Sequence, residues 1–291
     1  MENLLNMDIR RNHRDLSTEQ KATLIKAIWT LKNHLPSILK LGEQKRYDDF
    51  VQIHRNAMGG PNALVPNPHG GPLFYPWHRI LIRHFELALK EAAQNPDITL
   101  PYWDWQLTGR HNPFTPDFMG GDGDSLQNQR VTTGPFAHSN GMFPVRVWDS
   151  ASGDEGLRRN LGAEHDRALP RPEDVIFALA RTPYWAEAGW ENVSEDTLHN
   201  RVHAWVGGNM GGASSSNDPI FFLHHCYLDN LWEQWRKQHP LSEPFQSRAD
   251  APDEMLGSRL VFNPPNEPEP WPGTWTVEQT LSTEALGYRY E

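Results

Sequence analysis

Two histidines four residues apart, His199 and His203, are the residues whose type and spacing first indicate metal chemistry. On a helix, residues i and i+4 lie on one face about 5–6 Å apart, so both imidazoles can bind one ion. A glycine-rich loop follows, and the next helical pattern contains His224 and His225. A metal site between two helices of a bundle needs such a pair and a closing ligand. Taken alone, the same spacing is also common in histidine pairs of the surface or the core.

The chain repeats one pattern around two of its histidines. Residues 72–78 and 219–225 both have Pro six positions before a histidine, Phe four before it and an aromatic residue three before it. In both stretches an aromatic residue and a glutamate follow, seven and eight positions after the histidine. In this register the counterpart of His78 is His225, not His224. The repeat therefore predicts two metal half-sites, each ending in one of these units.

The ligand types limit the metal. Neutral imidazole suits zinc, copper, nickel and iron, whereas magnesium and calcium prefer oxygen ligands. Asn200 follows His199, so the glutamate base of HExxH zinc proteases is missing. A dizinc hydrolase would also need a carboxylate ligand or bridging acid near the histidines. Copper and dioxygen chemistry fits two all-imidazole sites best. The two sets of three consist of His54, His69, His78, His199, His203 and His225.

Helical patterns position most of these histidines. We expect helices at residues 18–33, 47–57, 77–94, 172–179, 195–206 and 219–238. Residues 59–71 form a turn-rich loop that carries His69. Residues 108–171 show little periodicity, which indicates a functional loop or short strands, with a candidate strand at 143–148. The predicted fold is mainly α: a central four-helix bundle holds the metal site, and long loops and a few short strands wrap around it.

The whole-chain composition excludes several classes of protein. With 291 residues and no linker or low-complexity tract, residues 1–291 are expected to form a single domain. The net charge of −10 argues against nucleic-acid binding, and no apolar run is long enough to span a membrane. Residues 1–16 lack the apolar stretch of a secretory signal peptide. The single cysteine, Cys226, excludes an internal disulfide and cysteine-based zinc or iron–sulfur sites.

Four stretches resemble the motifs of the tyrosinases, the type-3 copper family that includes catechol oxidases and haemocyanins. They read HNRVHAWVGG, NDPIFFLHH, FYPWHR and LPYWDW, and the bacterial, single-domain members are the most similar. The resemblance implies two copper ions, one on His54, His69 and His78, and one on His199, His203 and His225. It also implies the family reaction, with O2 as cosubstrate: ortho-hydroxylation of monophenols such as L-tyrosine and oxidation of o-diphenols to o-quinones, as in melanin formation.

Two residues outside the ligand sets bear on the choice among these oxidases. Asn200 follows His199, and Glu191 lies eight residues before it. In tyrosinases that hydroxylate phenols, Asn and Glu at these places are proposed to hold a water that deprotonates the phenol. Free phenol has a pKa of about 10, so a base is needed at neutral pH. The alternative is that Glu191 is a solvated loop acid and Asn200 a helix-surface amide.

The resemblance also implies which residues surround the substrate and the ligand rings. Small or apolar residues are expected at the pocket, and Phe221 is expected to stack on a histidine or on the substrate. Two carboxylates are candidate acceptors that orient imidazoles, although a structural salt bridge is an equal alternative for each. These residues are Ala204, Met210, Gly211, Ala213 and Phe221 for the pocket, and Asp104 and Asp218 for the carboxylates.

The remaining expectations concern partners and alternatives. The expected partner is a small phenolic substrate, and the protein is expected to be a monomer or a homodimer. Because a signal peptide is missing, a copper-loading helper protein is also expected, and the protein would be either cytoplasmic or exported together with that helper. Catechol oxidase or o-aminophenol oxidase is the alternative activity, and a haemocyanin-like O2 carrier the alternative class. No cysteine adjoins His69, so a Cys–His thioether cannot form. By resemblance, Arg10 should lie against Tyr288 or Tyr290, a contact worth about 0.5–2 kcal/mol.

Overall fold

The computed structural model describes residues 7–40, 42, 44–107, 112–148, 156–163, 168–240, 242 and 256–291. Residues 1–6, on which the expectation about a signal peptide partly rests, lie outside this range, as do parts of 108–171. Helices dominate the described residues and the strands are short, which confirms the mainly α prediction. Among the described residues, no helix is long and apolar enough to cross a membrane.

The helices follow the predicted order along the chain. The first is capped by a reciprocal pair in which the Ser17 hydroxyl accepts from the Gln20 N–H and the Gln20 side chain accepts from the Ser17 N–H. Seven α-helices are described: α1 Thr18–Asn33, α2 Arg46–Ala57, α3 Phe74–Ala93, α4 Pro172–Leu179, α5 Trp190–Ser194, α6 Asn200–Val206 and α7 Ile220–Gln238. A single π-helical turn, Glu195–His199, joins α5 to α6.

Two helix starts differ from the predictions. The helix predicted from residue 77 begins at Phe74, so Pro76 lies inside its first turn and His78 in its second. Proline is tolerated there because the first N–H groups of a helix have no partner within it. The helix predicted from residue 195 begins at Trp190 instead. The π-helical turn hides this continuity in the sequence, because it breaks the 3.6-residue period on which the prediction rests.

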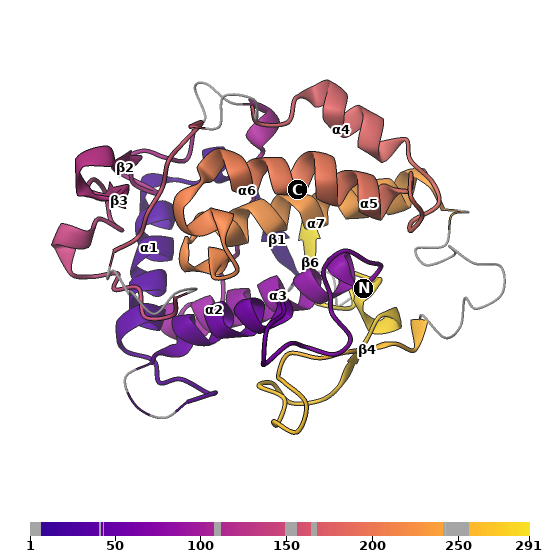
Figure 1. Ribbon diagram of the computed structural model, residues 1–291, viewed down its shortest axis with the longest axis horizontal. Helices are drawn as coiled ribbons and strands as arrows, with labels where there is room; N and C mark the ends of the chain where they lie inside the picture. The colour runs from indigo at the N-terminus through magenta and orange to yellow at the C-terminus, as the bar shows by residue number, and fades with distance from the viewer. Residues whose placement is uncertain are drawn as a thin grey trace.

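α3 and α7 lie at the centre of the molecule. α3 packs against α1, α2 and α7, and in Figure 1 α2 and α3 run below α5, α6 and α7. The Phe85 and Phe222 rings stack between α3 and α7, with centroids 3.5 Å apart. The histidine-bearing helices α2, α3, α6 and α7 thus surround the interior. That they form a four-helix bundle stays a prediction, as does the single domain spanning 1–291.

Three pairs of short strands complete the described part of the fold. They are β1 Asp8–Arg10 with β6 Tyr288–Tyr290, β2 Gly123–Asp124 with β3 Arg130–Val131, and β4 Arg259–Leu260 with β5 Trp275–Thr276. The first pair is parallel and the other two are antiparallel. The strand predicted at 143–148 is wrong, because these residues form no ladder. Alternation of apolar residues marks a half-buried extended segment, whether or not another strand pairs with it.

Arg10 joins the two ends of the chain to the core. Its side chain is fully buried, and its guanidinium lies 3.6 Å from the centroid of the Tyr288 ring, as predicted. Arg10 Nη2 donates to Glu86 Oε2 on α3 (2.8 Å), and Arg10 Nε donates to Glu86 Oε1 (3.1 Å). Asp229 on α7 accepts from the hydroxyls of Tyr288 (2.7 Å) and Tyr290 (2.5 Å). The β1–β6 pair is therefore anchored to both central helices.

Candidate metal centre

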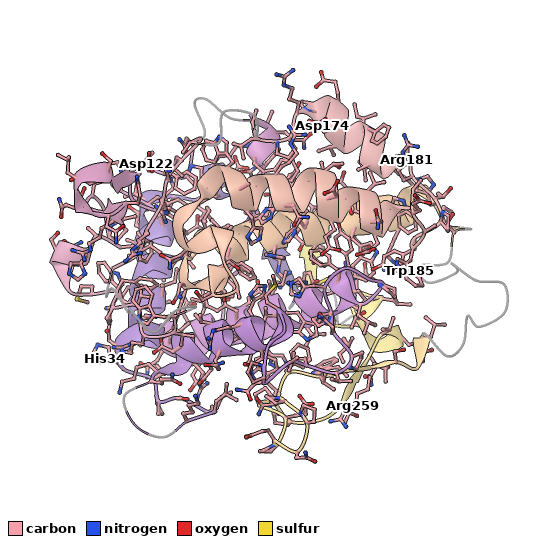
Figure 2. All side chains as sticks on the ribbon, viewed as in Figure 1. His34, Asp122, Asp174, Arg181, Trp185 and Arg259 are labelled. Carbon is pink, nitrogen blue, oxygen red and sulfur yellow. The ribbon has the colours of Figure 1, made fainter. Side chains whose placement is uncertain are left out.

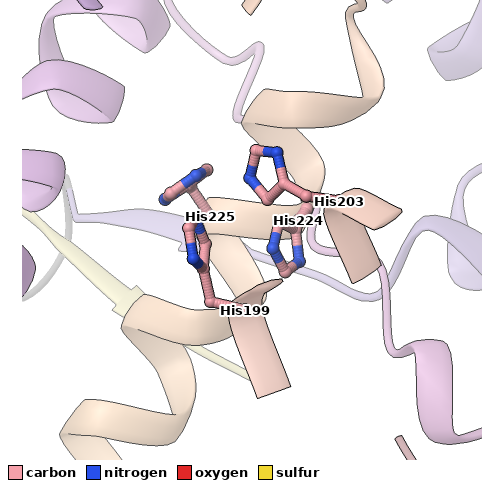
Figure 3. Close-up of side chains that lie close together, drawn as sticks. All are labelled: His199, His203, His224 and His225. Atoms are coloured by element: carbon pink, nitrogen blue, oxygen red, sulfur yellow. The ribbon is translucent and has the colours of Figure 1, made fainter. Parts of the chain in front are cut away.

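Seven histidine side chains gather in two adjoining groups. The first group consists of His54 on α2, His69 in the loop before α3, and His78 on α3. The second consists of His199, His203, His224 and His225, from the end of the π-helical turn, α6 and α7. Within each group the nitrogen atoms that could bind a metal lie within 4.8 Å of one another. Figure 3 shows the four rings of the second group meeting between two helices.

The two groups touch each other. The His78 and His225 rings stack with centroids 4.3 Å apart, and the His78 and His199 centroids are 6.5 Å apart. His78 and His225 are also the two histidines that the sequence repeat pairs. Their stacking brings α3 and α7, which carry the two repeats, together at the boundary of the groups, so that two ions held here would be neighbours.

Backbone carbonyls fix the orientation of four of the rings. Because a carbonyl oxygen only accepts, the ring nitrogen facing it must carry the proton. The Nδ1 atoms of His54, His69, His78 and His203 face the carbonyls of Ala213 (3.0 Å), Ala57 (3.2 Å), Phe74 (2.8 Å) and Met210 (2.7 Å), respectively. The Nε2 atom of each ring therefore keeps a lone pair that can bind a metal.

Asn200 orients a fifth ring. Its Oδ1 lies 3.0 Å from His199 Nδ1 and accepts the proton of that nitrogen, so the Nε2 atom of His199 is also left with a lone pair. For His225, neither ring nitrogen has a hydrogen-bond partner in the described part of the chain. A buried polar atom without a partner normally costs free energy, and such atoms are rare in native proteins.

The unpartnered nitrogens fit a pair of metal ions. The Nε2 atoms of His54, His69, His78, His199, His203 and His225 are all buried and have no partner among the described residues. Burial lowers the pKa of His69 to about 4 and that of His203 to about 4, and it lowers the pKa of the other four well below its usual range. The rings are therefore neutral at pH 7, as metal binding requires.

His224 is set apart from His225 by Trp105. The indole nitrogen of Trp105 can only donate, and it lies 3.1 Å from His224 Nδ1. His224 Nδ1 is therefore an acceptor, and its proton must sit on Nε2, so neither ring nitrogen is left with a free lone pair for a metal. The structure thus gives a physical reason for the register of the sequence repeat, in which His225 and not His224 closes the second site.

The two aspartates expected beside the imidazoles lie elsewhere. Asp218 forms a buried ion pair with Arg159, at 2.6 and 2.8 Å. Asp104 accepts from the backbone N–H of Gln106 at 3.2 Å. In the part of the chain that the structure describes, neither carboxylate is bonded to one of the six histidines. The salt-bridge alternative holds for Asp218, and backbone carbonyls, not carboxylates, face four of the six rings.

Aromatic rings enclose the histidines. The Phe221 ring lies against His225 in a tilted arrangement (4.1 Å between centroids) and edge-on against His54 (4.7 Å), so it contacts both groups but stacks on neither ring. Phe74 occupies the same position of the other repeat and packs against His78 (4.5 Å) and His199 (4.8 Å). The role of Phe74 was missed, although its place in the repeat was the signal that could have revealed it.

A cavity of about 990 Å³ opens onto the histidines. Its lining includes His54, His69, His199 and His203, and also five residues singled out from the sequence: Asn200, Ala204, Met210, Gly211 and Ala213. Two apolar side chains at its edge, Phe177 on α4 and Met58, are 50% and 46% exposed and were not expected. Asp174 of α4, labelled in Figure 2, also lines the cavity.

Glu191 is buried, not solvated. It is 1% exposed, and its Oε1 has no partner among the described residues. Burial is the main cause that raises the pKa of Glu191 to about 10, and the Glu195 carboxyl contributes to the same rise. Glu195, which lies four residues further along in the π-helical turn, was not singled out from the sequence.

Comparisons with known proteins agree with this geometry. A family model described as the common central domain of tyrosinase matches residues 44–238. A tyrosinase from Streptomyces glaucescens is 38% identical over 272 residues, covering 87% of this chain and 92% of the relative. A tyrosinase from Streptomyces antibioticus is 38% identical over 281 residues, covering 91% and 95%. These relatives match the chain over almost its whole length.

Solved structures with the same fold are more distant in sequence. A polyphenol oxidase variant from Thermothelomyces thermophila superposes with a TM-score of 0.73 at 22% identity, covering 98% of this chain and 89% of that chain. A functional unit of octopus hemocyanin superposes with a TM-score of 0.65 at 22% identity, covering 98% and 68%. At this identity they show the fold alone. From the family model and the Streptomyces relatives, the chain belongs to the tyrosinase family and is a copper-dependent oxidoreductase.

Proposed function

We propose that this enzyme hydroxylates monophenols in the ortho position and oxidises the resulting catechols to o-quinones, with O2 as the oxidant. The observation that carries the proposal is the gathering of six histidines with unpartnered Nε2 atoms, among the described residues, in two adjoining groups, four of whose members line one cavity. His54, His69 and His78 would hold one copper ion, and His199, His203 and His225 the other. When bound, the two ions supply the redox chemistry with O2. The chain itself supplies binding, orientation and proton transfer.

The cavity suits a phenol. Ala204 and Ala213 in its lining are small and leave room for a ring beside the histidines. Phe177 and Met58 at the edge offer apolar surface to the part of the substrate opposite the hydroxyl. Phe221, held between the two histidine groups, keeps their rings in place while the substrate approaches.

Deprotonation of the phenol separates the two candidate activities. A catechol has two acidic hydroxyls and needs little help, whereas a monophenol with a pKa of about 10 must lose its only phenolic proton to the protein. We propose that Asn200 orients a water molecule and that Glu191 accepts its proton. A general base must be ionised to accept a proton. Because burial raises the pKa of Glu191 to about 10, only the small ionised fraction of this carboxyl acts as the base at pH 7, and that fraction is a strong base.

Paired activity measurements test the proposal. The copper-loaded enzyme, Glu191→Gln and Asn200→Asp are assayed with L-tyrosine and with L-DOPA, followed at the absorbance of the quinone. Both variants should lose about 10²–10⁴-fold in turnover of L-tyrosine, which is the usual contribution of a general base, with a much smaller loss on L-DOPA. Equal losses on the two substrates would assign both residues a supporting role and favour catechol oxidase.

An oxidase without monophenol activity is the second candidate. A relative named grixazone synthase, from Streptomyces griseus, is 30% identical over 276 residues and covers 80% of this chain and 85% of the relative. This relative carries a different name from the Streptomyces tyrosinases, although it matches most of the chain. Family membership alone therefore does not decide between a tyrosinase and an oxidase that acts only on o-diphenols or o-aminophenols. We also propose a copper-loading helper protein and a monomeric or homodimeric state, which copper uptake assays and light scattering would test.

A further inference from the structure

We propose that Arg201 and Asp196 form a charged subsite in the cavity wall that recognises the amino-acid end of the substrate: Arg201 binds its carboxylate and Asp196 its ammonium group. The inference rests on the proposed oxidation of phenols and names the substrate class, a phenol with a zwitterionic α-amino-acid side chain. Both residues, together with Asp174, line the cavity that opens onto the histidines. A few placed polar groups in the wall of such a cavity fix the orientation and the identity of the ligand.

The π-helical turn places Asp196 and Arg201 on the same side of the helix. On a regular α-helix, residues five apart would point about 140° away from each other. In a π-helical turn the backbone hydrogen bonds join residues five apart, and here the Asn200 N–H bonds to the Glu195 carbonyl. Asp196 and Arg201 are also five residues apart, and both line the cavity together with Asn200. The turn thus brings two opposite charges beside the residue that orients His199.

Arg201 is held in place but keeps donors for a ligand. Its Nη1 donates to Asp174 Oδ2 at 3.0 Å, and its Nη2 donates to the Ala168 carbonyl at 3.0 Å. A guanidinium carries five N–H donors in a planar fork, so among the described residues its other donors stay open. The Arg201 side chain is 28% exposed, so a ligand in the cavity can reach it. This geometry suits a carboxylate, which an arginine fork binds with two parallel hydrogen bonds.

Asp174 fixes the direction of the guanidinium. Its Oδ2 also accepts the backbone N–H of Arg171 at 2.8 Å, at the start of α4. α4 packs against α5 and against the π-helical turn (Figure 1). Asp174 therefore holds Arg201 from a neighbouring helix, and its charge is already balanced by that contact.

Asp196 supplies the negative charge for an ammonium group. It is exposed, and it forms no ion pair with any cation in the described part of the chain. Because Arg201 pairs with Asp174 and not with Asp196, a ligand can enter between the two charges. A ligand with only an ammonium group would leave the open donors of Arg201 unused, and one with only a carboxylate would leave Asp196 unpaired. An α-amino acid satisfies both residues at once.

Four catechols with different side chains test the subsite. L-DOPA carries both charged groups, dopamine only the ammonium group, 3,4-dihydroxyphenylpropanoate only the carboxylate, and 4-methylcatechol neither. Catechols are chosen because they are oxidised whether or not the enzyme also hydroxylates monophenols. The values of kcat and KM are measured for each catechol with the copper-loaded wild type and variants, after the copper content of each protein has been matched.

Each variant should affect its own pair of substrates. Arg201→Gln should raise KM roughly three- to tenfold for the two catechols that carry a carboxylate, and Asp196→Asn should do the same for the two that carry an ammonium group. The kcat values should not change, because the lost contact is made equally with substrate and transition state. Arg201→Lys, which keeps the charge, should recover part of the loss. Glu173→Gln is the matched control and should change no KM, because Glu173 is an exposed acid of α4 outside the cavity lining.

A simpler role for Arg201 is to clamp α4 to α6 through Asp174. Loss of a clamp would displace Phe177 and the cavity edge, and would therefore raise KM for all four catechols, 4-methylcatechol included. That result would overturn the subsite. So would an unchanged KM for L-DOPA in both variants, or a selective response to only one of them, which would exclude recognition of a zwitterion.

The proposed function is judged separately, with L-tyrosine. If the four catechols follow the expected pattern but the wild type does not turn over L-tyrosine, the subsite stands and monophenol hydroxylation fails. If the wild type turns over L-tyrosine while the KM values for the catechols do not respond to Arg201→Gln and Asp196→Asn, only the subsite fails.

Discussion

Replacing His224 and His225 one at a time should have opposite consequences for the metal and for the fold. His225→Ala removes one of the three imidazoles closing the second group, so the protein should lose the copper ion held there and keep the other. His224→Ala should keep both ions, because the proton on His224 Nε2, required by the Trp105 contact, prevents coordination. Its cost should appear in the free energy of unfolding instead.

The size of that cost follows from the contact with Trp105. His224 is fully buried, and in His224→Ala the indole N–H, 3.1 Å from the lost nitrogen, has no acceptor. A buried donor left without a partner costs about 1–3 kcal/mol, to which the cavity adds. His224→Asn is the matched control, because its amide oxygen can occupy the place of Nδ1 and accept from Trp105. It should be less destabilised than His224→Ala by about the cost of the stranded donor, 1–3 kcal/mol.

Copper per chain is measured by elemental analysis after reconstitution, and stability by urea unfolding of the metal-free proteins. Metal-free protein is used for unfolding because a bound ion would add its own binding free energy to the stability. If His224→Ala loses an ion while His225→Ala keeps both, the register of the repeat and the tautomer assigned to His224 are both wrong. Equal unfolding free energies for His224→Ala and His224→Asn would show that the Trp105 contact contributes nothing.

Three further outcomes are expected. Arg10→Ala should lower the free energy of unfolding by about 3–5 kcal/mol, because it leaves buried charged partners unpaired. Arg11→Ala is the control: its exposed ion pair, with 3.5 Å between Arg11 Nε and Glu291 Oε2, should contribute only about 0–1 kcal/mol. Similar losses in the two variants would contradict the buried network. Metal-free protein should lose stability as the pH falls from about 6.5 to about 4. In that pH range His69 is protonated in the unfolded chain but not in the folded protein, where its pKa is about 4. Urea unfolding midpoints that do not change between these pH values would refute this. Gly208→Ala should lower the copper occupancy of the second group, because the φ of Gly208 is +54° and a Cβ would lie 2.2 Å from a backbone carbonyl oxygen. Gly211→Ala is the control and should keep its copper, because a Cβ there meets nothing within 4 Å. Equal copper contents in the two variants would contradict the prediction.

Much of the helical framework could be predicted from the sequence. The apolar periodicity and the capping residues of α1 and α4 act within a few positions along the chain, and both helices begin and end where they were predicted. The start of α3 was missed, because Pro76 suggests a boundary and only the three-dimensional position of the loop before it decides whether the helix continues past it. The π-helical turn before α6 was missed for a related reason, since it interrupts the period that the prediction used.

The sequence by itself determined which residue types meet in the candidate centre. The four-residue spacing of His199 and His203 and the repeat around His78 and His225 are local patterns, and a helix converts such spacings directly into shared faces. The surroundings of the rings could not be predicted in this way. Asp218, a candidate acceptor for an imidazole, is instead neutralised by Arg159, 59 residues away along the chain.

Only the tertiary structure decided the protonation of the site. The proton on each ring depends on the atom that faces it. For two rings that atom comes from a distant segment: Ala213 for His54, 159 residues away, and Trp105 for His224, 119 residues away. Burial of Glu191, which raises its pKa, likewise depends on how the helices and loops close around α5. Local sequence patterns determine which side chains share a helix face, whereas hydrogen-bond partners and loss of solvent exist only once distant parts of the chain have packed together.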